Sequence, residues 1–160
     1  QEAVEADKNP VEALTELAPV IDAIHTKYTD ITNENIGIGS TIFAVKPGDG
    51  SAREQAASCQ KVLGGWANIA NEYATKRYRS NLINWGMLPF LIEKGDLPFT
   101  NGDYIFLPDV RKAVEAKASE FEAYVVKDGS LIPFVLKMGE LTDDEREIIL
   151  KGCLINYNRQ

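Results

Sequence analysis

The residues best suited to chemistry form a glycine turn between an apolar run and a helical pattern. The apolar run is residues 41–45, and the turn that follows it reads Gly48-Asp49-Gly50-Ser51-Ala52-Arg53-Glu54-Gln55. Gly48 and Gly50 can adopt positive φ and let a ligand approach the backbone closely. Ser51 falls in the N-cap position, where free N–H groups and the helix dipole favour an anion. Because Arg53 adds a guanidinium that can bind a carboxylate with two hydrogen bonds, the turn predicts an anion site.

A purely structural interpretation explains the same octet. Gly-x-Gly-Ser turns often do nothing more than begin a helix. The octet alone leaves both interpretations open.

The elements around the turn predict a βαβ unit. Residues 36–45 are continuously apolar, which is typical of a central strand buried on both faces. The helix after the turn ends at Gly64-Gly65, and residues 66–71 alternate as a second, parallel strand does. Strand, helix and strand in this order form a right-handed unit that gathers ligands at the carboxyl ends of its strands.

The next helix, expected over residues 72–85 and closed by Gly86, carries two asparagines near its end. Asn81 and Asn84 either direct their amides at the turn that carries Ser51 or serve as helix caps.

The other segments predict further helices and strands. We expect an N-terminal helix that begins at Asn9 and is interrupted at Pro19, strands over residues 88–92 and 103–107, and a helix over residues 110–118. Residues 121–136 predict a hairpin with a type I′ turn at Asp128-Gly129. Thr142 and Glu145 predict a capping box for a helix that ends at Gly152, before a C-terminal tail over residues 153–160.

Three separated segments resemble one known family. The turn is followed by Leu63-Gly64-Gly65-Trp66-Ala67-Asn68-Ile69-Ala70 and then by Tyr78-Arg79-Ser80-Asn81-Leu82-Ile83-Asn84-Trp85-Gly86-Met87-Leu88-Pro89. This succession resembles the swivelling C-terminal domain of the aconitase family. The resemblance implies an α/β fold of the swivelling β/β/α type, with helices packed on a mixed sheet. It also implies a single domain over residues 9–160, after a linker or disordered end at residues 1–8, within a longer chain.

The resemblance assigns roles to the turn. Ser51 would be the catalytic base, acting as an alkoxide, and Arg53 would orient a substrate carboxylate, with Gly50 and Ala52 also binding substrate. Two residues depart from the family pattern, because Ala52 replaces a second serine and Gln55 replaces a histidine. Ala52 keeps only its backbone N–H as a donor, so we expect a substrate other than citrate.

Composition limits the remaining possibilities. A chain of 160 residues is expected to bury roughly 70% of its unfolded surface. A formal net charge of −7 argues against a nucleic-acid partner, and no segment predicts a membrane span. Cys59 and Cys153 are too few and too far apart for a metal motif, and we expect Cys59 to be a small buried residue. These features favour a reducing, cytoplasmic setting and no metal ligands within this chain. By resemblance, a 4Fe–4S cluster would be bound by cysteines of other domains.

Three functions are compatible with these observations. The chain is interpreted first as the C-terminal domain of an aconitase-like hydro-lyase that dehydrates and rehydrates a hydroxy di- or tricarboxylic acid. Its partners would then be the N-terminal aconitase domains of the same polypeptide, and the fragment alone would be inactive. The alternatives are a free-standing small subunit of an isopropylmalate dehydratase-type enzyme, which binds a large subunit, and a non-catalytic carboxylate-binding module.

Overall fold

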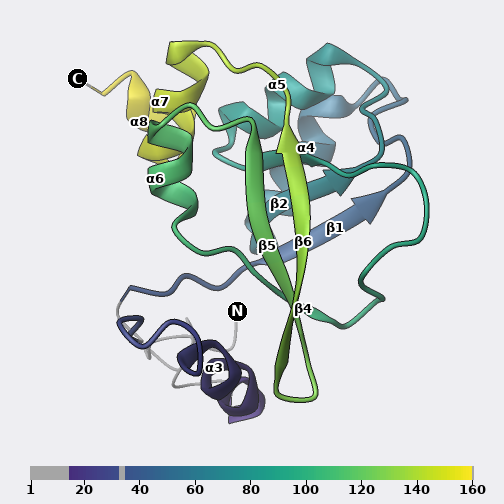
Figure 1. Cartoon of the computed structure of the whole chain (residues 1–160). Coiled ribbons are helices and arrows are strands. Elements are labelled where there is room, and N and C mark those ends of the chain that lie inside the picture. Colours follow the sequence, from purple (N-terminus) through teal and green to yellow (C-terminus); the bar gives the residue numbers. More distant parts are fainter. Residues whose placement is uncertain (1–14, 33–34, 160) are drawn as a thin grey trace. The chain divides into compact units, whose positions relative to one another are not determined.

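A computed structural model describes residues 15–32 and 35–159, which form two compact units (Figure 1). The first unit comprises the residues up to Ile38 together with Asp96–Pro108 and Glu122–Phe134. The second comprises Gly39–Gly95, Asp109–Phe121 and Val135–Gln160, and it carries the turn that was singled out by the sequence. The expected linker at residues 1–8 and the expected helix start at Asn9 lie outside the described residues.

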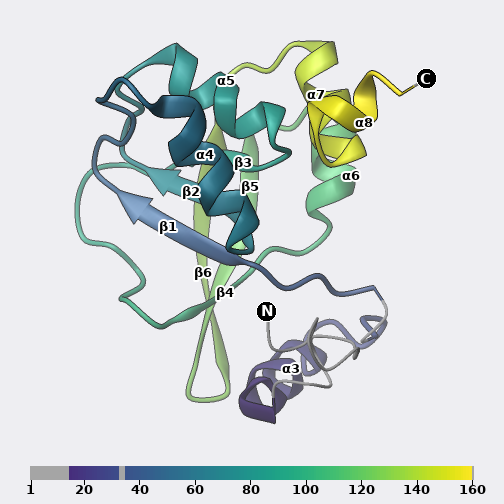
Figure 2. The same ribbon diagram turned by 180° about the vertical axis from the view of Figure 1, so that it is seen from behind.

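The second unit begins with three parallel strands and the two helices that connect them. The elements in chain order are β1 (Ser40–Ala44), α4 (Arg53–Val62), β2 (Gly65–Ala70), α5 (Lys76–Asn84) and β3 (Leu88–Leu91). Strand β2 pairs in parallel with β1 on one side and with β3 on the other. Helices α4 and α5 cover the same face of these strands, as the opposite views in Figures 1 and 2 show. The predicted βαβ unit is therefore confirmed.

The sheet is mixed, as expected. Strand β3 pairs in antiparallel fashion with β6 (Ser130–Met138), and β4 (Tyr104–Phe106) pairs in antiparallel fashion with β5 (Glu120–Lys127). The hydrogen-bonded strand order is β1-β2-β3-β6-β5-β4. Between β5 and β6, Asp128 and Gly129 both adopt positive φ, 49° and 75°, as a type I′ turn requires. The predicted hairpin is confirmed.

The prediction that residues 36–45 form a central strand is wrong. Strand β1 is shorter than the apolar run, and it lies at the edge of the described sheet, where β2 is its one neighbour among the described strands. The side chains of Ile42 and Val45 are accordingly 48% and 60% exposed. A short apolar run does not distinguish an edge strand from a central one, because β-branched and aromatic residues are enriched in strands of both kinds.

Three helices follow in the later parts of the second unit. They are α6 (Val110–Glu115), α7 (Asp143–Lys151) and the short α8 (Leu154–Tyr157). Helix α7 begins with the predicted capping box, in which the Thr142 hydroxyl accepts from the Glu145 N–H at 3.2 Å and the Glu145 carboxylate accepts from the Thr142 N–H at 2.8 Å. The expected tail contains α8, so the prediction of an irregular C-terminus is wrong for residues 154–157.

The first unit is built on its own apolar cluster. A 3₁₀ turn, η1 (Thr15–Leu17), is followed directly by α3 (Ala18–His25). Pro19 is the second residue of α3 and thus lies in its first turn. A proline is tolerated there because that N–H has no partner within the helix, so the expected interruption at Pro19 is a helix start. The buried residues of this cluster are Ala23, Ile24 and Val126.

The core of the second unit lies beneath α4 and α5. Its buried cluster comprises Ala57, Tyr78, Leu82 and Met87, with Tyr73 and Trp85 packed against it. This cluster fixes the two helices relative to each other, and thereby the turn from which α4 starts. No helix in the described part of the chain is both long and apolar enough to cross a membrane.

Candidate active site

The turn between β1 and α4 rests on an aromatic ring. Gly48 has φ of 96°, a conformation that residues with a side chain rarely adopt. A Cβ at this position would lie 2.5 Å from Cγ of Tyr78, a buried residue of α5. Gly48 is therefore required both by its backbone conformation and by the close approach of Tyr78. Gly50 differs from the expectation, since its φ is not positive and a Cβ there would meet nothing within 4 Å.

The prediction that Ser51 is the N-cap of the helix is wrong. Helix α4 begins at Arg53 with Ala52 as its N-cap, and no side chain of the cap residue bonds the first turn. Ser51 lies one residue earlier, in a bend, and is exposed. No residue in the described part of the chain forms a hydrogen bond with its hydroxyl. The hydroxyl is therefore available to a ligand, which a capping hydroxyl would not be.

Arg53 is folded back over the turn. Its Nε donates to the carbonyl oxygen of Gly48 at 3.2 Å, and its side chain is half-buried. Among the described residues, none accepts a hydrogen bond from its terminal guanidinium nitrogens. The guanidinium is thus anchored at one edge and keeps a second edge for an anion.

The first turn of α4 is fixed by two residues of the α5 region. In the amide orientation that satisfies both groups, Asn81 donates to Glu54 Oε2 at 3.0 Å and accepts from the Glu54 N–H at 3.2 Å. The indole Nε1 of Trp85 donates to Glu54 Oε1 at 2.7 Å. Of the two asparagines considered from the sequence, Asn81 reaches this turn, and no described contact of this kind involves Asn84.

Two backbone donors remain at the start of α4. The first N–H groups of a helix have no acceptor within it, and Asn81 satisfies only that of Glu54. Within residues 35–159, no acceptor is found for the N–H groups of Arg53 and Gln55. Together with the dipole of a helix of 10 residues, these donors favour negative charge beside Ser51.

A buried polar network beneath the turn was not predicted from the sequence. The Gln60 amide donates to the Asn68 side-chain oxygen, and the Asn68 amide donates to the Tyr78 hydroxyl at 3.2 Å. The Tyr73 hydroxyl donates to the carbonyl oxygen of Phe90 at 2.9 Å. Burial raises the pKa of Tyr73 well above its ordinary value. An asparagine within the buried strand β2 was the available signal, because a buried amide requires partners.

The donor set of this chain does not fit an iron–sulfur cluster. A 4Fe–4S cluster is held by several cysteine thiolates, whereas the sequence contains only Cys59 and Cys153. Cys59 lies on α4 and is exposed, so the prediction that it is buried is wrong, and Cys153 directly precedes α8. In the described ranges, no three His, Cys, Asp or Glu side chains are grouped as metal ligands would be.

Sequence comparison places this fold and turn in one family. A family model described as the aconitase C-terminal domain matches residues 5–95, which is more than half of the chain. The chain belongs to this family, and it is an aconitase-like hydro-lyase domain with the family's α/β fold.

A solved structure supports the same classification. The chain is similar to the crystal structure of 3-isopropylmalate dehydratase from Methanocaldococcus jannaschii, with 26% sequence identity and a TM-score of 0.54. The similarity covers 92% of this chain and 80% of that chain. No curated protein matches the sequence.

Proposed function

We propose that this chain supplies the catalytic base and a carboxylate-binding arginine to a hydro-lyase that acts on a hydroxy di- or tricarboxylic acid. The observation that carries this proposal is the turn at residues 48–53. It presents an exposed Ser51 hydroxyl, free N–H groups at the start of α4 and the anchored guanidinium of Arg53.

In the proposed reaction, Ser51 removes a proton from the carbon next to the one that loses its hydroxyl group. The electron pair of the broken C–H bond forms the double bond, and the hydroxyl group departs with its own electron pair. A serine hydroxyl is a very weak acid, so its oxygen must be stabilised as an anion before it can act as the base. The N–H groups of Arg53 and Gln55, the dipole of α4 and the Arg53 guanidinium provide this stabilisation without reorganising.

Arg53 and the turn also bind the substrate. The free edge of the guanidinium suits a carboxylate, and Gly50 leaves open space in which a ligand can approach the backbone. Ala52 contributes only its N–H, so the site lacks one hydroxyl donor that the family turn has. We therefore expect a substrate other than citrate, and the name of the similar dehydratase suggests a hydroxy dicarboxylate with an apolar branch.

We propose that the Lewis acid that assists departure of the hydroxyl group lies outside this chain. It would be a 4Fe–4S cluster held by the cysteines of another domain or subunit. Two arrangements supply it: aconitase domains of the same polypeptide, or a separate large subunit. The similarity to 80% of a dehydratase chain supports the second arrangement. Mass determination of the source protein under native and denaturing conditions distinguishes them, since only a separate small subunit leaves this chain at its own mass in denaturant.

Replacing Ser51 tests the proposal. In the assembled enzyme, Ser51→Ala is expected to lower kcat about 10²- to 10⁴-fold, the usual contribution of a general base. The thermal midpoint should not change, because the hydroxyl is exposed and has no described partner. Ser58→Ala is the matched control, since Ser58 lies on the helix that follows Ser51 and its hydroxyl bonds only the Gln55 carbonyl among the described residues. A Ser51→Ala enzyme as active as the Ser58→Ala enzyme would contradict the proposal.

A non-catalytic module is the second candidate, and Ala52 and Gln55 favour it because both depart from the family turn. Amide chemical shifts of Gly50 to Arg53, followed during titration with tricarballylate, separate the possibilities. Binding together with turnover in the assembled enzyme supports the hydro-lyase. Binding without turnover supports the module, and the absence of any shift at the turn contradicts both.

A further inference from the structure

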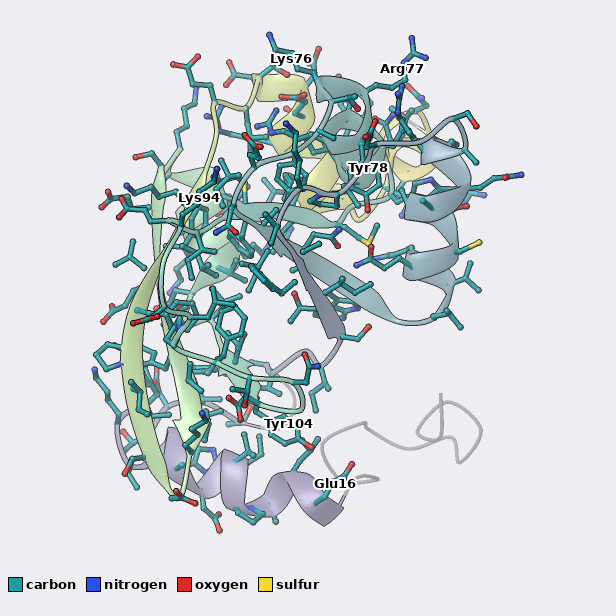
Figure 3. All side chains as sticks on the ribbon, turned by 90° about the vertical axis from the view of Figure 1, so that its right-hand side faces the viewer. Glu16, Lys76, Arg77, Tyr78, Lys94 and Tyr104 are labelled. Carbon is teal, nitrogen blue, oxygen red and sulfur yellow. The ribbon has the colours of Figure 1, made fainter. Side chains whose placement is uncertain are left out.

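Charged residues follow each of the three parallel strands. Lys46 lies two residues after β1, Glu72 two residues after β2, and Lys94 three residues after β3. Because these strands are parallel, their carboxyl ends meet at one edge of the sheet, which is also the edge from which the Ser51 turn leaves β1. The arrowheads of β1 and β2 mark this edge in Figure 1, and Lys94 is labelled in Figure 3.

Backbone hydrogen bonds hold Lys46 beside Glu72. Beyond the ends of the strands, the Glu72 N–H donates to the Val45 carbonyl at 3.2 Å, and the Ala74 N–H donates to the Pro47 carbonyl at 2.9 Å. The Lys46 ammonium lies 3.0 Å from Glu72 Oε1. The backbone of Lys46 is therefore held in place two residues before Gly48, at the start of the turn.

The end of β3 is anchored in the same way. The Ile92 N–H donates to the Ala70 carbonyl at 2.9 Å, and the Asn71 amide donates to the carbonyl oxygens of Ile92 at 3.1 Å and Glu93 at 3.3 Å. Lys94 follows Glu93 directly in the chain. The pKa of Glu72 is lowered, mainly by its hydrogen bond with Lys46, and the Lys94 ammonium lowers it further.

Three cations gather around this edge. Lys46, Lys94 and Arg53 contribute three positive charges, whereas Glu72 and the exposed Asp49 contribute two negative ones. Of the other nearby carboxylates, Glu93 pairs with Lys137 at 2.8 Å. Glu54 keeps its negative charge, but its carboxylate is directed to α5, where it accepts from Asn81 and Trp85. An anion with more than one carboxylate complements this arrangement.

We propose that Lys46 and Lys94 form a second carboxylate subsite, in which Glu72 takes the place of a substrate carboxylate when no substrate is bound. The assignment rests on the proposed function, because the first carboxylate would lie on Arg53. The Lys46 and Glu72 side chains are 56% and 48% exposed. Ion pairs this accessible to water contribute little to stability, so exchanging Glu72 for a substrate carboxylate costs little.

Titration of the full chain with tricarballylate tests the subsite, with amide chemical shifts as the readout. Lys46→Gln and Lys94→Gln should each weaken binding about fivefold, the scale of an exposed charge pair. Glu72→Gln should strengthen binding, because it removes the competing carboxylate. A change in net charge alone would give the same two signs, so a charge change elsewhere on the chain is needed to separate it from a subsite.

Lys117→Gln is the matched control. It also removes one positive charge and one ion pair, between Lys117 and Asp143 at 2.7 Å. It lies on the side of α6 and α7, which Figures 1 and 2 show at the opposite end of the second unit from the arrowheads of β1 and β2.

Two results would overturn the subsite. If Arg53→Gln abolishes binding while Lys46→Gln and Lys94→Gln bind no more weakly than Lys117→Gln, the subsite is wrong and the proposed function stands. If Arg53→Gln binds normally and no shift occurs at Gly50 to Arg53, the proposed function is wrong and the assignment fails with it.

Discussion

Asn81 on α5 and Glu54 on α4 form a reciprocal pair, in which the asparagine amide donates to the carboxylate and its oxygen accepts from the Glu54 N–H. A residue from the neighbouring helix thus caps the first turn of α4. The Ser51 hydroxyl therefore does not cap the helix, and the Glu54 carboxylate is directed to α5. The availability of the proposed base therefore depends on a residue thirty positions later in the chain.

The same pair makes Asn81 important for stability. Asn81→Asp keeps an acceptor for the Glu54 N–H, but it removes the amide donor to Glu54 Oε2 and places a second carboxylate against that of Glu54. We expect the free energy of unfolding to fall by about 1–3 kcal/mol, measured by urea denaturation. Asn84→Asp is the control and should cost less than about 1 kcal/mol, because only the unfavourable position of a carboxylate near a helix C-terminus remains. Equal losses for the two variants would show that the pair contributes nothing.

Gly48 and Gly50 are expected to respond differently to alanine. Gly48→Ala introduces a Cβ at positive φ and against the Tyr78 ring, and it should lower the free energy of unfolding by about 2–4 kcal/mol. Gly50→Ala meets open space without positive φ, so a change below about 1 kcal/mol is expected. Urea denaturation of both variants checks this, and a Gly48→Ala chain as stable as Gly50→Ala would refute the described turn.

Tyr28 is expected to ionise late in an alkaline titration. Its hydrogen bond to the Tyr124 hydroxyl, 3.3 Å long, and its burial raise the pKa of Tyr28 from 10.0 to about 12. Between these values the unfolded chain loses the proton and the folded chain keeps it. The stabilisation is therefore present below pH 10.0 and is lost as the pH rises to about 12. Tyr28→Phe should remove the component of the tyrosinate absorbance that titrates at about pH 12, while the late ionisation of the partly buried Tyr73 remains. An unchanged titration of that variant would contradict the assignment.

Cys59 is expected to react rapidly with a thiol reagent in the folded chain. It is exposed on α4, whereas Cys153 is only partly exposed. Under native conditions, one thiol should react fast and the other more slowly, and Cys59→Ser should abolish the fast phase. A fast phase that survives in Cys59→Ser and disappears in Cys153→Ser would reverse the two environments.

The sequence predicted best where the determining interactions are local. The Asp128-Gly129 turn, the Thr142 capping box and the strand that follows Gly64-Gly65 all depend on residues within a few positions, and the structure confirms them. The family resemblance was likewise carried by contiguous segments. These features needed no knowledge of which elements meet in space.

The predictions were wrong where contacts between residues far apart in the sequence determine the structure. Ser51 is not the N-cap, because Asn81 from another helix satisfies the Glu54 N–H. Residues 36–45 were expected to be central, although strand order is set by pairing with segments far along the chain. Cys59 is exposed because the buried Ala57 and Gln60 define one face of α4 and Cys59 lies on the other. The sequence did not indicate this, since a polar glutamine does not mark the buried face of a helix.

The order of strand pairing carries a consequence for how the chain folds. Strands β1, β2 and β3 are consecutive and form their contacts across short stretches of sequence. The pairing of β3 with β6, by contrast, joins Leu91 with Lys137 and Phe90 with Met138, which are far apart in the sequence. Closing that long loop carries the larger entropic cost. The nucleus is thus expected to assemble around the turn at residues 48–53, with the C-terminal half of the chain docking afterwards as the slower kinetic phase.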